Sequence, residues 1–344
     1  MPCRQPVRAV VALTLLSAAG VVAAQSCGQT VTGTVRLTAD LYCSGPGPAF
    51  TLSGSAARLE LAGFRIDMGG SGANAIDIHH AQNAQVTGPG VISRAGIAVS
   101  VFRSTDVDLW DFEVENSNAG VFALDSVRVA VSNSRFSKIK DQAVFIGSTP
   151  GGTLHTAGAV VMGNLIKDVG SGIHLCGQGT TDARVRHNTI RRANGWGIFL
   201  YDGASFAQVH RNDVQVSAFQ PAIEVRSGSE NAIHDNVLAG SRLGSGVAIG
   251  SLTGQTCAVN ANTTANHNVV SRNTVKGFVH GTRIGLRNGG MAHFNNVQGN
   301  LYDGNGVDVM LERDSYATDA RGNDGGTRGV GGVAVRDAGT LSLY

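Results

Sequence analysis

A short pattern recurs through most of the chain: a small residue, an aliphatic residue, any residue, and a second aliphatic residue. Successive copies begin 21 to 35 residues apart, and most of these spacings are 23 to 25. Repetition of this kind predicts a stack of similar units, each of which buries its aliphatic side chains against the next. The first aliphatic position of each copy, or its equivalent, is Ile76, Ile97, Val121, Val144, Ile173, Ile198, Ile223, Val247, Thr282 and Val307.

A second pattern, in which an Asn is followed two residues later by an aliphatic residue, runs in step with the first. From Asn164 to Asn236 its spacing is 24 residues each time. The segments between the two patterns alternate polar and apolar residues, which is typical of strands with one buried face. We expect the Asn residues to occupy turns, because Asn tolerates left-handed backbone geometry, and to stack their amides into a hydrogen-bonded ladder.

The composition narrows the choice of repeat architecture. The chain has 47 Gly, 7 Pro, 15% charged and 42% hydrophobic residues among 344. Gly costs about 1 kcal/mol at a helix-interior position, so helical repeats are disfavoured, and scarce Pro excludes collagen. The hydrophobic content argues against disorder. A unit of about 24 residues is too short for a propeller blade, and the leucine-rich pattern is absent, so a parallel β-solenoid remains.

With its recurring Gly-Ile-x-Leu and Asn-x-Ile register, the chain resembles the right-handed parallel β-helix proteins, the superfamily of pectate lyases and similar polysaccharide enzymes. The resemblance covers roughly residues 50 to 313. It implies an all-β fold, a right-handed parallel β-helix (solenoid) of about ten to eleven coils over residues 49–313. We expect an N-terminal cap at residues 25–48, a Gly-rich C-terminal cap or mobile tail at residues 314–344, and a monomer.

The first 24 residues have the features of a signal peptide. Arg4 and Arg8 precede an apolar run at residues 9–16, and small residues at 22–24 provide a cleavage site. We therefore expect a secreted or periplasmic protein without a membrane span in the mature chain. Removal of the two Arg residues takes the formal charge from +2 to zero (2 − 2 = 0), which argues against a nucleic-acid partner.

Four cysteines follow the predicted signal peptide, and an exported chain can oxidise them. Cys27 and Cys43 are close in sequence, so we expect them to form a disulfide bond near the N-terminal end. Cys176 and Cys257 either form a second disulfide bond or remain as two free buried thiols.

Residues between the two buried aliphatic positions of each repeat point outward, and equivalent residues of successive coils form rows. The middle of these rows contains a polar cluster, which we predict to be exposed. Because aromatic and charged groups on one sheet suit sugar rings that bear carboxylates, this cluster is the candidate site. The plainer alternative is a set of ordinary cross-strand charge pairs. The cluster comprises His174, Phe199, Tyr201, Asp202, Glu224 and Arg226, with Arg283 at its margin.

A second polar column lies on the strand before the Asn turn. It contains Arg186, His210, His234 and Ser271, with His293 as a further candidate. His210 and His234 should lie one coil apart, about 4.8 Å. This spacing allows a metal pair, a base with its partner, or contacts to substrate. The alternative, which we favour, is an exposed polar strand face.

The resemblance implies a polysaccharide lyase, an epimerase or a hydrolase. β-Elimination at a uronic acid requires a neutralised carboxylate, a base for the C5 proton and an acid for the leaving oxygen. Arg226 or Arg283 can neutralise the carboxylate, and His174 can be the base if its pKa lies near the working pH. Tyr201 can be the acid. Glu224 and Asp202 can orient an Arg or bind a cation, and Ca²⁺ is the cofactor that the resemblance suggests.

Several family motifs are missing from the sequence. The acidic clusters of pectate lyases, the Asp-Pro-His-Asp motif of mannuronan epimerases, and the paired Asp and Gly-His-Gly motifs of polygalacturonases are absent. A two-carboxylate hydrolase is therefore disfavoured relative to proton abstraction. We predict a lyase that acts on a uronate-containing polysaccharide. The alternatives are a uronate C5-epimerase of the same fold and a non-catalytic carbohydrate-binding or structural surface protein.

Overall fold

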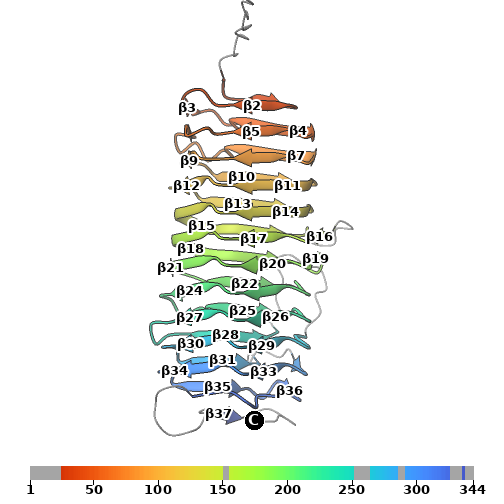
Figure 1. Cartoon of the computed structure of the whole chain (residues 1–344), viewed down its shortest axis with the longest axis vertical. Helices are drawn as coiled ribbons and strands as arrows, with labels where there is room; N and C mark the ends of the chain where they lie inside the picture. Colours follow the sequence, from red (N-terminus) through yellow and green to blue (C-terminus); the bar gives the residue numbers. More distant parts are fainter. Residues whose placement is uncertain (1–24, 150–154, 252–263, 286–290, 326–334, 338–344) are drawn as a thin grey trace, which may run out of the picture.

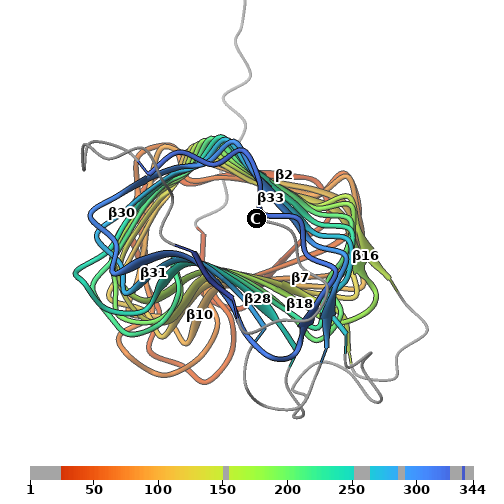
Figure 2. The ribbon, with the colours of Figure 1, turned by 90° about the horizontal axis from the view of Figure 1, so that it is seen from below.

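The computed structural model describes residues 25–149, 155–251, 264–285, 291–325 and 335–337. The predicted signal peptide, residues 1–24, lies outside this part. The described residues form parallel strands and no helix, and they wind into a right-handed solenoid of about eleven coils (Figure 1). Seen along the long axis, the coils superpose (Figure 2). The predicted fold class is confirmed.

Each complete coil contributes one strand to each of three faces, which we name A, B and C in chain order. Strands of one face pair in parallel with those of the preceding and following coils. Face A comprises β1 (Gln29–Val31), β4 (Phe50–Ser55), β7 (Ile76–Gln82), β10 (Ile97–Phe102), β13 (Ala119–Leu124), the C-terminal parts of β15 (Arg135–Gly147) and β18 (Leu165–Cys176), β22 (Ile198–Tyr201), β25 (Ile223–Arg226), β28 (Ser245–Gly250), β31 (His280–Ile284), β35 (Val307–Leu311) and β37 (Val335–Asp337).

Faces B and C follow face A within each coil and meet at the turn that contains the repeated Asn. Face B comprises β2 (Thr34–Arg36), β5 (Arg58–Glu60), β8 (Gln85–Thr87), β11 (Thr105–Trp110), β14 (Val127–Ser132), β17 (Val160–Met162), β20 (Arg184–Arg186), β23 (Gln208–His210), β26 (Ala232–His234), β29 (Val269–Ser271) and β33 (Asn296–Gln298). Face C comprises β3 (Leu41–Tyr42), β6 (Arg65–Asp67), β9 (Val91–Ser93), β12 (Glu113–Glu115), the N-terminal parts of β15 and β18, β21 (Thr189–Ala193), β24 (Asp213–Val216), β27 (Val237–Ala239), β30 (Thr274–Lys276) and β34 (Leu301–Asp303).

Four short strands lie outside the three faces. They form two separate pairs, β16 (Thr156–Ala157) with β19 (Thr180–Thr181) and β32 (Ala292–His293) with β36 (Ser315–Tyr316). No helix among the described residues is long and apolar enough to cross a membrane.

The aliphatic positions of the repeat fill the coil interior. Val121, Ile173 and most of their equivalents are fully buried, because the period-two alternation directs them away from water on every coil. The predicted register is wrong by two residues at two copies. Val99 rather than Ile97 pairs with Val121, and Val309 rather than Val307 takes the position after β31. A two-residue shift keeps the same side chains facing inward, so the alternation alone cannot detect it.

The Asn ladder is confirmed on the turn between faces B and C. Each side-chain amide donates to the next Asn Oδ1 at 2.9–3.0 Å, and most also donate to a main-chain carbonyl. The left-handed residue precedes each Asn in the sequence, as at Arg211 (φ 54°) and Asp235 (φ 56°). The Asn residues themselves are buried, except for the half-buried Asn323 at the end of the ladder. The ladder runs through Asn164, Asn188, Asn212, Asn236, Asn273, Asn300 and Asn323.

Both ends of the described chain continue the coil. Strands β1–β3, within the predicted N-terminal cap, pair with β4–β6 and form the first coil. The predicted bond between Cys27 and Cys43 is present there, with a Cα–Cα distance of 5.8 Å. At the other end, isolated bridges at Asp319 and Asp324 and the last ladder residue, Asn323, lie in the predicted C-terminal tail.

Candidate functional site

Face A assembles the polar cluster that the repeat register predicts. Phe145, His174, Phe199 and Glu224 occupy equivalent positions on β15, β18, β22 and β25. The next outward row on the same strands contains Cys176, Tyr201 and Arg226. His174, Tyr201 and Arg226 therefore come from three consecutive coils, which brings the three predicted catalytic groups together.

The predicted exposure of this cluster is wrong. His174, Phe199 and Glu224 are 3–4% exposed and Tyr201 is 9% exposed, although all four lie outside the coil interior. The reason is aromatic packing, because three stacked rings of the coil that contains β22 cover His174 of the preceding coil. Phe199 stacks on Tyr201 with ring centroids 4.3 Å apart, and Trp196 stacks on Phe199 at 4.5 Å. The cluster is thus a second, smaller apolar centre on the outer side of face A.

Trp196, which the sequence reasoning missed, also holds the charged part of the cluster. Its Nε1–H donates to one carboxylate oxygen of Glu224, and the Arg226 guanidinium donates to the other at 2.7–2.8 Å. The Arg226 Cζ lies 4.6 Å from the centre of the Phe199 ring, a cation–π contact. A lone Trp between two Gly residues, immediately before a strand of the site, was the available signal.

His174 is the least satisfied polar group of the cluster. Its imidazole meets the Trp196, Phe199 and Tyr201 rings edge-on at centroid distances of 5.3–5.9 Å. Both ring nitrogens are buried, and neither has a hydrogen-bond partner among the described residues. Burial, followed by the positive charge of Arg226, lowers the pKa of His174 to about 3. The free protein therefore holds a neutral imidazole near neutral pH, and the condition for His174 as the base, a pKa near the working pH, is not met there.

Tyr201 keeps its proton over a wide pH range. Burial, and then the negative charge of Asp202, raise the pKa of the Tyr201 phenol to about 12. Near neutral pH the cluster therefore contains a neutral acceptor at His174 and a protonated donor at Tyr201, with Arg226 beside them. This combination can accept a proton, supply a proton and bind a carboxylate.

The depressed pKa of His174 predicts an acid-sensitive contribution to stability. The unfolded chain protonates His174 near pH 6.5, whereas the folded chain does so only near pH 3. The contribution is therefore present above pH 6.5 and is lost as the pH falls toward 3. Between pH 7 and pH 4 it amounts to about 3 kcal/mol. Urea unfolding of the wild type and the His174→Phe variant at both pH values measures it.

Wild type and His174→Phe contain the same carboxylates, whose titration affects the stability of both alike. The difference between their losses of stability therefore isolates His174. Phe suits the position because Phe145 and Phe199 flank it in the same row. His210→Gln is the matched control, since His210 is half-buried on face B and should account for little of the effect. An equal loss of stability on acidification in wild type and His174→Phe would show that the imidazole is solvated in the folded protein.

Two predicted site residues lie differently from the central cluster. Arg283 is two coils beyond Glu224 in the same row, and its guanidinium pairs with Glu312 at 3.0 Å. Asp202 is buried after Tyr201, and one of its oxygens is 3.9 Å from the Cys176 sulfur. Cys176 is disulfide-bonded. Cys257 lies outside the described residues, so the pairing of these two cysteines stays a prediction.

The second predicted column lies on face B, away from the cluster on face A. His210 and His234 stack in parallel with ring centroids 4.9 Å apart, as the coil spacing predicts. The column continues through Ser271 to Gln298, so the expected place of His293 is wrong. Stacked parallel rings do not converge on one ion, and no group of three or more His, Cys, Asp or Glu in the described ranges is arranged to hold a metal.

Charged neighbours set the protonation of this column. His234 Nδ1 lies 2.7 Å from an Asp235 oxygen, and the guanidinium of Arg272 bonds to the same carboxylate. Arg272 and His234 together hold the pKa of Asp235 well below its usual range. Burial, and then the neighbouring His234, lower the pKa of His210. The column is therefore a half-buried, partly ion-paired strand face, and the choice between a functional role and an ordinary polar face stays a prediction.

Comparison with known proteins identifies the family. A family described as "Right handed beta helix region" matches residues 66–238, just over half of the chain. The chain belongs to the right-handed β-helix family. A comparison with curated protein sequences gives no match.

Solved β-helix structures resemble this one in fold at low sequence identity. A tailspike protein of Escherichia coli bacteriophage HK620 is 11% identical, with a TM-score of 0.55 over 91% of this chain and 72% of its own. A PL6 alginate lyase solved with a trisaccharide is 11% identical, with a TM-score of 0.54 over 92% and 90%. An exopolygalacturonase from Thermotoga maritima is 12% identical, with a TM-score of 0.51 over 86% and 79%. These likenesses establish the shared fold.

Proposed function

We propose that this protein is a secreted or periplasmic enzyme that removes the C5 proton of a uronate in an acidic polysaccharide, acting as a lyase. The observation that carries the proposal is the buried His174, whose two ring nitrogens have no hydrogen-bond partner in the described part of the chain, beside Arg226 and the protonated Tyr201. Similar folds include a PL6 alginate lyase and an exopolygalacturonase, which supports a polysaccharide as the substrate class. The Cys27–Cys43 disulfide bond supports export.

The residues of the cluster have complementary roles in this reaction. Arg226, whose side chain is 22% exposed, is placed to bind the uronate carboxylate in addition to Glu224. The bound carboxylate offsets the positive charge that contributes to the low pKa of His174, so the imidazole becomes a stronger base when substrate is present. The half-buried Trp196 provides an apolar ring beside the sugar, and the buried Phe199 supports it from behind.

Proton movements can then be assigned to individual groups. His174 accepts the C5 proton, the C5 electron pair forms the C4–C5 double bond, and the C4–O bond breaks. Tyr201 donates its proton to the leaving O4 oxygen. The raised pKa of Tyr201 keeps this proton on the phenol until that step. In an epimerase the C4–O bond stays intact and a proton returns to C5 from the opposite side of the ring.

The residues of the cluster do not fit the Ca²⁺ that the fold family suggested. Trp196 and Arg226 already engage both oxygens of the Glu224 carboxylate. Ca²⁺ prefers six to eight oxygen ligands. In the described part of the chain, no three or more His, Cys, Asp or Glu side chains are grouped so that they could hold a metal ion. The proposed steps therefore use protein groups alone.

The test uses the wild-type protein with alginate, pectin and glycosaminoglycans in D₂O. Absorbance of the unsaturated product reports elimination, and NMR reports deuterium at C5. Elimination on one of these polymers is the expected result. Deuterium incorporation without unsaturated product would identify an epimerase instead. The absence of both signals on every polymer would overturn the proposal.

A non-catalytic carbohydrate-binding protein is the second candidate. It is favoured by the saturated hydrogen bonding of Glu224 and by the low basicity of His174 in the free protein. Binding of an acidic oligosaccharide that perturbs Trp196 fluorescence, with neither C5 exchange nor elimination, would support this candidate.

A further inference from the structure

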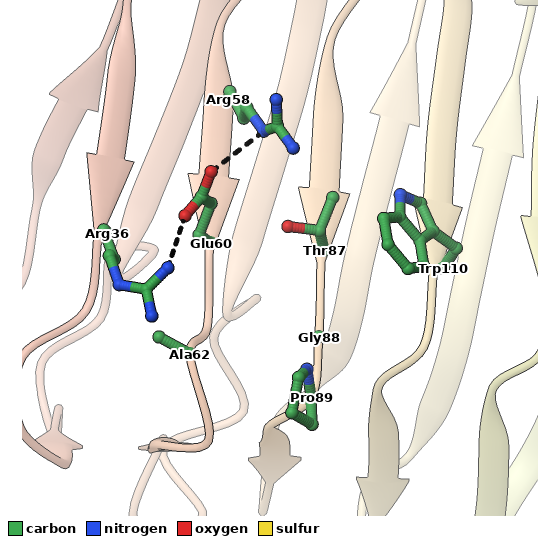
Figure 3. Close-up of a pocket in the computed structure, with 8 residues that line it drawn as sticks. All are labelled: Arg36, Arg58, Glu60, Ala62, Thr87, Gly88, Pro89 and Trp110. Atoms are coloured by element: carbon green, nitrogen blue, oxygen red, sulfur yellow. Dashed lines mark hydrogen bonds and ion pairs between the residues drawn. The ribbon is translucent and has the colours of Figure 1, made fainter.

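A depression on face B lies near the N-terminal end of the solenoid, remote from the cluster on face A. In register, the column of His210 extends back through seven earlier coils, and its last four members are Trp110, Thr87, Glu60 and Arg36. The depression has a volume of about 290 Å³, at the lower end of small-molecule sites (about 300–1,000 Å³). It is lined by Arg36, Arg58, Glu60, Ala62, Thr87, Gly88, Pro89 and Trp110 (Figure 3).

The charges of the depression leave an excess of positive charge. The Glu60 carboxylate pairs with Arg36 at 2.9 Å and with Arg58 at 3.2 Å, each through a different oxygen. One carboxylate therefore holds two guanidinium groups, and the lining residues have a net charge of +1. The Arg36 and Arg58 side chains are 67% and 41% exposed, so both cations remain accessible to a ligand.

An exposed aromatic ring completes the depression. Figure 3 shows Trp110 on one side and the Arg36–Glu60–Arg58 group on the other, with Thr87 between them. Trp110 is 40% exposed, so part of its indole ring is open to solvent. The two sides thus offer different chemistry, a flat apolar surface and a pair of planar cations.

The backbone at one lining residue, Gly88, packs closely against the next coil. A Cβ atom on Gly88 would lie only 1.4 Å from the main-chain oxygen of Asp111 on the next coil. Only glycine fits there, because the Asp111 carbonyl occupies the place that a side chain would take. The depression is therefore set by rigid coil-to-coil contacts, which are well suited to hold a binding site.

We propose that this depression binds one carboxylate-bearing sugar unit of an acidic polysaccharide, as a non-catalytic subsite separate from face A. Arg36 and Arg58 bind the sugar carboxylate, because the planar guanidinium matches carboxylate geometry. The C–H face of the sugar ring packs on the Trp110 indole. The inference goes beyond the proposed reaction, since a protein without any activity would still bind through these groups.

The two Trp residues of the chain allow the two places to be tested separately, because Trp110 lies in the depression and Trp196 in the cluster on face A. In the Trp196→Phe variant, fluorescence reports the depression alone. Titration with oligogalacturonate and oligomannuronate is expected to give a saturable change. Arg36→Gln with Arg58→Gln in that background should weaken binding by about tenfold to a hundredfold.

Matched controls separate the possible outcomes. Arg128→Gln removes an exposed, ion-paired Arg outside the depression and should leave the titration unchanged. A neutral cello-oligosaccharide should bind more weakly than the uronates. Calorimetry of wild type against the double Arg variant gives the same comparison with Trp196 intact. In the Trp110→Phe variant, fluorescence reports Trp196 alone. A fluorescence change in that variant but not in Trp196→Phe would overturn the inference, and so would equal binding of neutral and acidic sugars. Either result leaves the proposed reaction untouched.

Discussion

Replacement of Asn212 by Leu is expected to lower the free energy of unfolding by about 2–6 kcal/mol, one of the two largest effects predicted for this protein. Asn212 accepts from the Asn188 backbone N–H and donates to the Val185 carbonyl, and both of these groups are buried on the preceding coil. Leu leaves both without a partner. Each unsatisfied group costs about 1–3 kcal/mol, which gives the expected range.

Urea unfolding followed by circular dichroism measures this effect. Asn194→Leu is the control, because Asn194 is exposed and its side chain has no part in the ladder. It should change stability by less than about 0.5 kcal/mol. A loss of less than 1 kcal/mol for Asn212→Leu would mean that water or a local rearrangement replaces the ladder bonds, and that the ladder contributes little.

The His174→Phe variant is expected to lose at least about a hundredfold in the rate of C5 proton exchange, since a positioned base contributes about 10²–10⁴-fold. This prediction rests on the proposed reaction. The variant should remain folded, because the neighbouring positions of the row are both Phe.

Tyr201→Phe is expected to retain C5 exchange but to lose elimination, because it keeps the base and removes the proton donor.

The control for both variants is His210→Gln, which removes a half-buried imidazole on face B. It should keep full activity. Circular dichroism and thermal unfolding of each variant distinguish a lost base from a lost fold. Wild-type exchange rates in His174→Phe would place the base elsewhere and leave the fold assignment intact.

The period-two alternation and the spacing of the repeat predicted the fold, the Asn ladder and the residues that meet on face A. These features depend on local sequence and on the near-identity of successive coils. The two-residue shifts at Ile97 and Val307 were not predictable from alternation, because a shift by two keeps every side chain on the same side.

The burial of the cluster depends on contacts that no single repeat contains. Whether His174 is exposed is decided by Trp196, in a turn one coil later, and by stacking of Phe199 on Tyr201. The depression on face B was missed for a related reason. Its residues lie on β2, β5, β8 and β11, and the strands around Arg36 and Arg58 precede the first recognisable copy of the repeat.

The final amide of the ladder bears on whether these molecules polymerise. Along the ladder each Asn side-chain N–H donates to the Asn of the next coil toward the C-terminal end. If the last Asn had no acceptor in its own chain, its free N–H could bond to the first coil of another molecule. At Asn323 the side-chain nitrogen donates instead to the carbonyls of Val297 and Ala320. Both amide hydrogens are consumed within the chain, and this ladder therefore offers no directional template for end-to-end growth into filaments.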